Sequence, residues 1–181
     1  MKKAFLFLAN GFEESEAIVP ADILRRGGVE LTVVSVTGKR EVVSANKITV
    51  VADRLFDECD FGAADMLILP GGMPGAKNLN EHDALKKLLA QFAAQGGWVA
   101  ALCAAPIVLG GLGLLEGCEA TCYPGFEGQL AGATYTAQPT EIDGKIITGR
   151  GPGYAYGFGF ALLAALMGEA VAKEVKAAMF P

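Results

Sequence analysis

The stretch WVAALCAAPIVL, residues 98–109, decides the fold, because it joins an apolar strand-like run to the beginning of a helix. Cys103 lies at the junction, with one alanine two positions before it (Ala101) and another two positions after it (Ala105). Pro106 follows, and proline is tolerated in a first helical turn, where its missing N–H would have no partner. The stretch therefore predicts a buried strand, a sharp turn at Cys103 and a helix.

The same alternation of strand and helix continues along the chain in both directions. Short apolar runs rich in valine, isoleucine, leucine and phenylalanine are typical of buried strands, and segments with helical periodicity lie between several of them. The runs are AFLFLA (4–9), ELTVVSV (30–36), MLILP (66–70), GWVAAL (97–102) and KIITG (145–149), and the helical segments are 14–26, 83–95, 104–112 and 154–167. Continuous apolar strands separated by helices indicate a parallel sheet covered on both faces. We predict an α/β fold, a flavodoxin-like doubly wound sandwich with a mostly parallel sheet.

One segment departs from this alternation. REVVSANKITVV (40–51) has a polar centre between two β-type runs and predicts a small β-hairpin. The chain has 181 residues, the size of one domain, and no linker, repeat or low-complexity segment interrupts it. We therefore expect a single domain over residues 1–181.

Charge and hydropathy exclude two classes of partner. The net charge of -5 gives no electrostatic attraction to nucleic acid or to anionic lipid. The apolar run 4–9 is shorter than the roughly 7–15 residues of a signal-peptide core, and the uncharged stretch 151–168 leaves a helix of about 15 residues, below the ~20 that span a bilayer. We expect a soluble, cytoplasmic protein without nucleic-acid or membrane partners. Its four cysteines, which are Cys59, Cys103, Cys118 and Cys122, are then reduced thiols.

Candidate catalytic or binding residues follow three of the predicted strands. NGFEESE (10–16) follows the first strand, GGMPGA (71–76) follows MLILP, and Cys103 follows GWVAAL. In doubly wound sheets ligands bind beyond the carboxyl ends of the strands. A strand-to-helix turn resembles a nucleophile elbow, and a helix start favours thiolate over thiol, so the pKa of Cys103 is predicted below the ordinary value of about 8.5. The alternative is simple packing, because free cysteine is often a buried small hydrophobe.

Four stretches together carry a family resemblance. GFEESEAIVPADILRRGG (11–28), MLILPGGMPGAKNL (66–79), VAALCAAP (99–106) and ITGRGPGYAYGFGFAL (147–162) resemble, in this order, the DJ-1/PfpI superfamily, most closely its DJ-1 branch. The resemblance implies a flavodoxin-like fold, a homodimer and an oxidation-prone cysteine at Cys103. It also implies that the carboxyl of Glu16 hydrogen-bonds the sulfur. The backbone donors near the site would then be Gly71, Gly72 and Ala104.

Glu16 has two interpretations. It lies at the start of the first predicted helix, where acidic residues complement the helix dipole, as Glu13 and Glu14 also would. With the resemblance, Glu16 becomes a catalytic residue instead. A carboxyl and a thiol in one cavity disfavour two adjacent negative charges, so the carboxyl is expected to keep its proton while the sulfur ionises.

The chain departs from the family pattern beside the cysteine. Many members have a His-Pro pair there, whereas this chain has Tyr123 followed by proline, and a tyrosine is a poor base near neutral pH. The only histidine, His82, falls at a polar helix entry and is expected to be solvated. A cysteine peptidase triad is therefore the less favoured reading. Arg150 ends another strand and is a candidate contact for an anionic substrate group, although an ion pair at a loop or dimer contact explains it equally well.

The resemblance implies thiol chemistry on small dicarbonyls such as methylglyoxal and glyoxal, a glyoxalase-like or deglycase-like activity with Cys103 and Glu16 as catalytic residues. The alternative function is a redox sensor or chaperone that responds to an oxidant such as peroxide through Cys103. We expect no cofactor and no metal, since the Cys118 and Cys122 pair has no second ligand pair. A homodimer is expected from the family and from the exposed-helix pattern of AIVPADILRRGG (17–28), which offers the apolar side chains of Ile18, Val19 and Ile23 beside Arg25 and Arg26.

Overall fold

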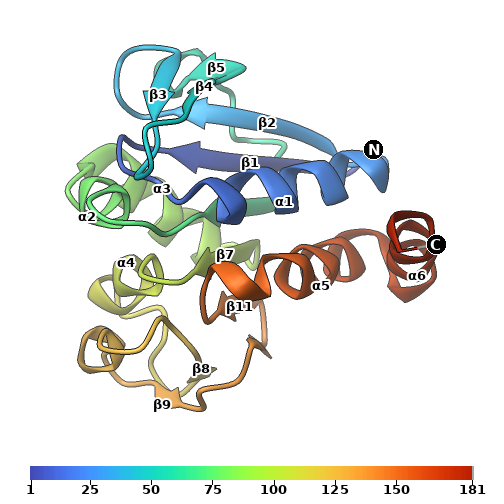
Figure 1. Ribbon diagram of the computed structural model, residues 1–181. Coiled ribbons are helices and arrows are strands. Elements are labelled where there is room, and N and C mark those ends of the chain that lie inside the picture. Colours follow the sequence, from blue (N-terminus) through green and yellow to red (C-terminus); the bar gives the residue numbers. More distant parts are fainter. Residues whose placement is uncertain (181) are drawn as a thin grey trace.

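A seven-stranded sheet forms the centre of the protein in the computed structural model, which describes residues 1–180 (Figure 1). The strand order is β10-β11-β7-β6-β1-β2-β5, and all neighbours are parallel except β10 and β11. The strands are β1 (Lys3–Leu8), β2 (Glu30–Ser35), β5 (Arg54–Leu55), β6 (Met66–Leu69), β7 (Trp98–Leu102), β10 (Thr140–Asp143) and β11 (Ile146–Gly149). This mostly parallel sheet confirms the predicted fold class.

Six α-helices connect or follow the strands. They are α1 (Glu14–Arg26), α2 (Gly75–Asn80), α3 (Asp83–Ala94), α4 (Pro106–Gly111), α5 (Ala155–Met167) and α6 (Glu169–Met179). Helices α1 and α5 lie side by side and pack against each other (Figure 1). The chain moves in opposite directions from β1 to β2 and from β6 to β7, so right-handed crossovers place α1 and α3 on opposite faces.

The central strands are apolar because helices cover them. Every residue from β6 is buried, as are those of β11, and β1 and β7 are buried apart from their first residues. The apolar run at the N-terminus is thus the buried strand β1, as predicted. Within residues 1–180, no helix is long and apolar enough to cross a membrane, and α5 has only 13 residues.

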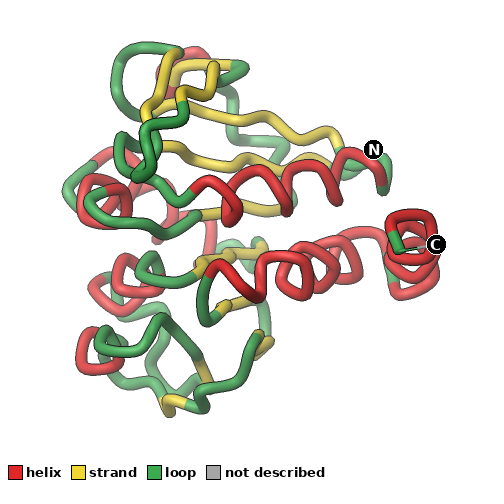
Figure 2. Tube along the Cα trace, viewed as in Figure 1, coloured by secondary structure: helices red, strands yellow, loops and turns green. Residues whose placement is uncertain are grey.

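The segment 40–51 forms the predicted hairpin. Strands β3 (Glu41–Val43) and β4 (Thr49–Val51) pair antiparallel in a sheet of their own. The carboxylate of Glu14 binds this hairpin to the start of α1, because it accepts hydrogen bonds from the Ser44 hydroxyl and from the backbone N–H of Asn46, the latter at 2.8 Å. Loops form most of the chain from α4 to β10, interrupted by the short strands β8 (Glu119–Ala120) and β9 (Thr134–Tyr135) (Figure 2).

The expected apolar surface of α1 is only partly present. Ile18 is exposed and Val19 is half-buried, but Ile23 is completely buried, where it faces α5. The two arginines at the end of α1 pair within the chain, Arg25 with Asp53 and Arg26 with Asp22. The sequence-based expectation for Ile23 was wrong because α5 packs on that side of the helix, which the periodicity of α1 alone does not reveal.

The strand order changes direction between β1 and β6. In doubly wound sheets such a switch point leaves a crevice beyond the carboxyl ends of the strands, between loops that diverge to opposite faces. The loop after β1 leads to α1, and the loop after β6 leads to α2. The residues that follow β1, β6 and β7 are therefore placed next to one another.

Candidate active site

The loops after β1, β6 and β7 converge on three residues. Strand β6 lies between β1 and β7; the loops after β6 and β7 carry Gly71 and Cys103, and the loop after β1 leads into the first turn of α1, which carries Glu16. A Cβ atom placed on Gly71 would lie 2.7 Å from both the Cβ of Cys103 and Oε2 of Glu16, so the three residues are in contact. The structure thus brings together the strand-end residues that the sequence singled out.

Cys103 adopts a backbone conformation that a side chain rarely takes. Its φ is 65°, in the left-handed region, which costs a non-glycine residue on the order of 1–3 kcal/mol. Its N–H donates to the Gly149 carbonyl at 2.8 Å and its carbonyl accepts from the Tyr123 N–H at 2.8 Å. These bonds from two flanking segments hold the strained turn. The side chain is 8% exposed, and the alanines at 101 and 105 are fully buried, consistent with a nucleophile elbow.

Glu16 is completely buried in the first turn of α1. The side chain of Glu13 caps this helix, because its Oε2 accepts the Glu16 N–H at 2.8 Å and the Ser15 hydroxyl at 2.6 Å. The Glu13 N–H in turn donates to the Gly71 carbonyl at 3.0 Å. Glu13 therefore fixes the position of Glu16 relative to the loop after β6. The sequence suggested only a dipole role for Glu13, since a capping contact depends on where the chain turns.

The two carboxyl oxygens of Glu16 have different surroundings. Oε2 accepts the Gly71 N–H at 2.8 Å, whereas Oε1 is buried without a well-formed hydrogen bond. The carboxyl lies within hydrogen-bonding reach of the Cys103 thiol. Burial, reinforced by the negative charge of Glu13, raises the pKa of Glu16 to about 7, although hydrogen bonds from Cys103 and Gly71 oppose the rise. Glu16 is thus protonated in a large share of molecules at neutral pH.

The pKa of the Cys103 thiol is shifted in the direction opposite to the one predicted from the sequence. Burial, together with the adjacent Glu16 carboxylate, raises the pKa of Cys103 to about 12, and N–H groups of Gly72 and Ala104 oppose the rise. The sequence predicted a lowered pKa from a helix start, but α4 has only six residues and begins three positions later. Protonation of Glu16 removes its charge and turns it from acceptor to donor, so the thiolate forms in the state where Glu16 holds the proton.

The backbone donors divide into two kinds. The N–H groups of Gly72 and Ala104 face the sulfur, in line with the expected donor role. The N–H of Gly71 instead donates to Glu16. Gly71 therefore does not act as a donor to the sulfur; it orients the carboxyl, and it is glycine because the contact leaves no room for a side chain.

A methyl group at Gly71 tests this contact. In Gly71→Ala the new Cβ would meet Cys103, Glu16 and the Leu102 carbonyl, each at 2.7 Å. We expect a loss of about 1–3 kcal/mol in the free energy of unfolding, the usual cost of overpacking, measured by chemical denaturation. Gly157→Ala is the matched control, since nothing lies within 4 Å of its added Cβ in α5. Equal stability of the two variants would contradict the close packing at Gly71.

Tyr123 and Arg150 line one groove beside Cys103. This groove has a volume of about 370 Å³ and is formed by Tyr123, Pro124, Arg150, Gly151, Pro152, Gly153 and Tyr154. It adjoins the elbow because Tyr123 and Gly149, the residue before Arg150, hold the Cys103 backbone. The Tyr123 side chain is 45% exposed. Both candidate contact residues are therefore close to the cysteine in the fold.

His82 begins a helix, at the predicted helix entry. It is the N-cap of α3, and its Nδ1 accepts the Leu85 N–H at 3.1 Å. The ring also packs at a tilt against Phe56 with a centroid distance of 5.0 Å, and the residue is half-buried rather than solvated. His82 thus supports the fold and does not complete a triad with Cys103.

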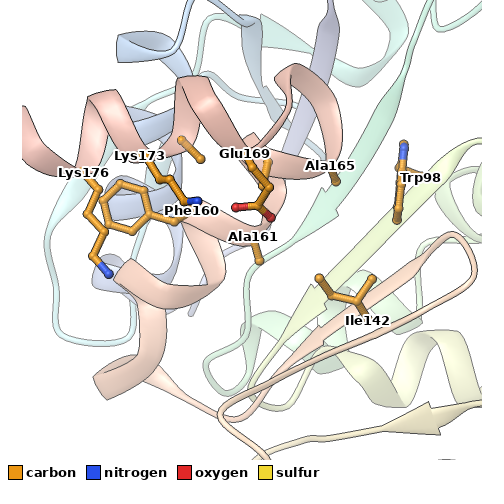
Figure 3. Close-up of a pocket in the computed structure, with 10 residues that line it drawn as sticks. Trp98, Ile142, Phe160, Ala161, Ala165, Glu169, Lys173 and Lys176 are labelled. Atoms are coloured by element: carbon orange, nitrogen blue, oxygen red, sulfur yellow. The ribbon is translucent and has the colours of Figure 1, made fainter.

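A larger groove, of about 420 Å³, lies elsewhere (Figure 3). Trp98, Ile142 and Phe160 line it, together with Glu169, Lys173 and Lys176 from α6. Trp98 is the first residue of β7 and Cys103 follows the last, and five residues of strand span about 16 Å. This groove is therefore at the opposite end of the sheet from the cysteine.

Comparison with known proteins places the chain in a family. The model of the DJ-1/PfpI family matches residues 2–165. The chain is 42% identical over 176 residues to Protein DJ-1 homolog B of Arabidopsis thaliana, and this covers 96% of the chain but 40% of that longer protein. It is 37% identical over 180 residues to the Parkinson disease protein 7 homolog of Danio rerio, which covers 97% of the chain and 95% of that protein.

Solved structures agree with the sequence matches. Toxoplasma gondii DJ-1 in an oxidized form superposes with a TM-score of 0.95 at 34% identity, covering 99% of this chain and 98% of that chain. DJ-1beta of Drosophila melanogaster superposes with a TM-score of 0.93, also at 34% identity, over 99% and 97% of the two chains. Because the family model matches residues 2–165 and a relative 37% identical covers 97% of the chain, the chain belongs to the DJ-1/PfpI family.

Proposed function

We propose that the protein converts small dicarbonyls such as methylglyoxal and glyoxal by glyoxalase-like or deglycase-like thiol chemistry. The observation that carries this proposal is the contact between Cys103 at a strained elbow and the buried carboxyl of Glu16. A thiol next to an acid with a pKa near neutrality supplies a nucleophile together with a group that both gives and takes a proton.

The first step is addition of sulfur to the aldehyde. The Cys103 thiolate forms a C–S bond with the aldehyde carbon of methylglyoxal, and the electrons of the C=O bond move to oxygen. That oxygen takes the proton of Glu16, which yields a hemithioacetal and a Glu16 carboxylate. The N–H groups of Gly72 and Ala104 stabilise negative charge at this point of the cavity.

The second step moves hydrogen between neighbouring carbons. The Glu16 carboxylate removes the C–H proton from the former aldehyde carbon and delivers it to the adjacent carbon, while the hydroxyl proton passes to the adjacent oxygen. The first carbon is thereby oxidised to a thioester and the second is reduced to an alcohol. Water then cleaves the thioester, which releases lactate with one proton and returns Cys103 and Glu16 to their starting state.

The alternative is a redox sensor or chaperone. Peroxide would oxidise the Cys103 thiolate to sulfenate and then to sulfinate, whose oxygens the N–H groups of Gly72 and Ala104 would bind. Two observations favour this candidate: the Tyr123–Pro124 pair offers no histidine base beside the cysteine, and the Toxoplasma gondii relative was solved in an oxidized form.

Turnover separates the two proposals. Methylglyoxal consumption is measured with reduced protein and with peroxide-treated protein. The enzymatic proposal expects turnover by the reduced sample and its loss after oxidation of Cys103, since the sulfinate is no nucleophile. Absence of turnover by the reduced protein above the background of a Cys103→Ser variant would favour the sensor.

A homodimer is also proposed, as the family resemblance implies. Exposed apolar side chains on α1 and on the hairpin support it: Ile18 is 47% exposed, Ile48 55% and Val51 66%. We expect light scattering at micromolar concentration to give a mass about twice the 18.8 kDa of one chain. A mass near that of a single chain would overturn the dimer.

A further inference from the structure

The groove beside Cys103 contains an arginine, Arg150, that forms no ion pair among residues 1–180. Three of the five arginines in residues 1–180 bind carboxylates, namely Arg25, Arg26 and Arg40. Arg150 is half-buried as a residue, and within that range its side chain makes no ion pair or hydrogen bond. A guanidinium without an internal partner keeps its N–H donors available, so such a group is suited to receive a ligand.

Glu127 is the acidic residue whose charge interacts with Arg150. Its carboxylate is engaged elsewhere, because both of its oxygens accept the Gly125 N–H at 2.9 Å. Glu127 therefore closes its own turn and does not neutralise Arg150 by direct contact. Arg150 lines the groove, with Tyr123 and Tyr154 among the other lining residues.

The groove walls suit a small planar anion. The Tyr123 ring lies against Gly151, where an added Cβ would be 3.2 Å from its Cδ2, so the absence of a side chain at residue 151 lets the ring pack over the backbone. Two tyrosine rings and one guanidinium form an amphipathic surface, and the planar fork of arginine matches a carboxylate in geometry.

We propose that Arg150 is an anion-binding residue for the carboxylate of a carbonyl substrate whose carbonyl carbon reacts at Cys103. The proposal rests on the proposed function in one respect, that Cys103 is the nucleophile. It names the substrate class more narrowly: an aldehyde or dicarbonyl that also carries a carboxylate reacts in preference to an uncharged dicarbonyl of similar size.

Two alkylating reagents test this assignment without requiring turnover. Iodoacetate carries a carboxylate, while iodoacetamide has nearly the same shape and no charge. The second-order rate of Cys103 modification by each reagent is followed by peptide mapping at low ionic strength. We expect the iodoacetate-to-iodoacetamide rate ratio at Cys103 to fall about fivefold in Arg150→Gln, the scale of one half-exposed charged contact, with the iodoacetamide rate unchanged.

Controls distinguish a local contact from general charge. Arg54→Gln removes an arginine on β5, at the far edge of the sheet, that also lacks an ion pair, and it should leave the ratio unchanged. Arg150→Lys keeps the charge and should retain part of the preference. In the wild-type protein, raising the salt concentration should lower the iodoacetate rate alone, which tests the charge without any substitution.

The results distinguish failure of the anion site at Arg150 from failure of Cys103 as the nucleophile. An unchanged ratio in Arg150→Gln, or an equal fall in Arg54→Gln, overturns the anion site and leaves Cys103 as the nucleophile. Failure of Cys103 to react with iodoacetamide in the wild-type protein overturns the nucleophile, and the anion site with it.

Discussion

Replacing Cys103 with serine is expected to abolish dicarbonyl turnover and peroxide sensitivity together, since a hydroxyl is a far weaker nucleophile than a thiolate and is not oxidised. Glu16→Gln is expected to lower turnover by ~10²–10⁴-fold, the usual range for loss of a general acid–base, while the protein stays folded and Cys103 stays oxidisable. Glutamine keeps an oxygen for the Gly71 N–H and an N–H donor for the sulfur, but it moves no proton.

Steady-state methylglyoxal consumption measures this effect, with circular dichroism as the test of folding. Cys59→Ser is the matched control, because Cys59 is half-buried near the edge strand β5 and its thiol donates to the Leu55 carbonyl at 3.4 Å. Full activity in Glu16→Gln would contradict the proton-transfer role of Glu16. Activity in Cys103→Ser would contradict the nucleophile itself.

Glu16→Gln is also expected to change how stability depends on pH. Burial raises the pKa of Glu16 from 4.5 to about 7 in the folded protein. Between these values the folded chain binds more protons than the unfolded chain, so the contribution of Glu16 to stability is full below pH 4.5 and is lost as the pH rises through about 7. A shift of this size corresponds to about 3 kcal/mol at high pH.

The measurement is the free energy of unfolding of both proteins by chemical denaturation between pH 4 and pH 9. Titrating groups that do not interact with Glu16 cancel in the difference between the two proteins, and Cys103, which does interact with it, titrates above this pH range. The wild type should lose stability relative to Glu16→Gln by about 3 kcal/mol from pH 4 to pH 9. A difference that does not change with pH would show that Glu16 has an ordinary pKa and is not the proton carrier.

Local sequence patterns predicted the strands that are buried along nearly their whole length. The apolar runs of β1, β6, β7 and β11 are buried on both sides, and such runs differ clearly from amphipathic helices. The hairpin at 40–51 was predicted from its polar centre. Helices α2 and α6 were not predicted: α2 has six residues, and α6 follows α5 after the single residue Gly168. Hydrophobic periodicity does not reveal a helix of six residues, and it does not show that one residue separates two consecutive helices.

The sequence predicted which residues form the site, but not all of their hydrogen bonds or pKa shifts. The rule that ligands bind beyond strand ends, with the family resemblance, put Glu16 and Cys103 in one cavity. The donor role of Gly71 and the sign of the thiol pKa shift were wrong, because both depend on the buried Glu16 carboxylate. Ile23 was assigned to the surface for a similar reason, since its burial depends on α5. Contacts between elements distant in the chain decide each of these properties.

Competition among the four cysteines tests the central claim most directly. Burial raises the pKa of Cys59, Cys118 and Cys122. The carboxyls that act on them, those of Glu58, Asp143 and Glu127, are exposed or half-buried, whereas Glu16 beside Cys103 is fully buried and its pKa is raised to about 7. Limiting iodoacetamide at pH 7, followed by peptide mapping, should modify Cys103 first in the wild type and in Glu16→Gln. Modification of Cys59, Cys118 or Cys122 before Cys103 would contradict the assignment of Cys103 as the reactive nucleophile.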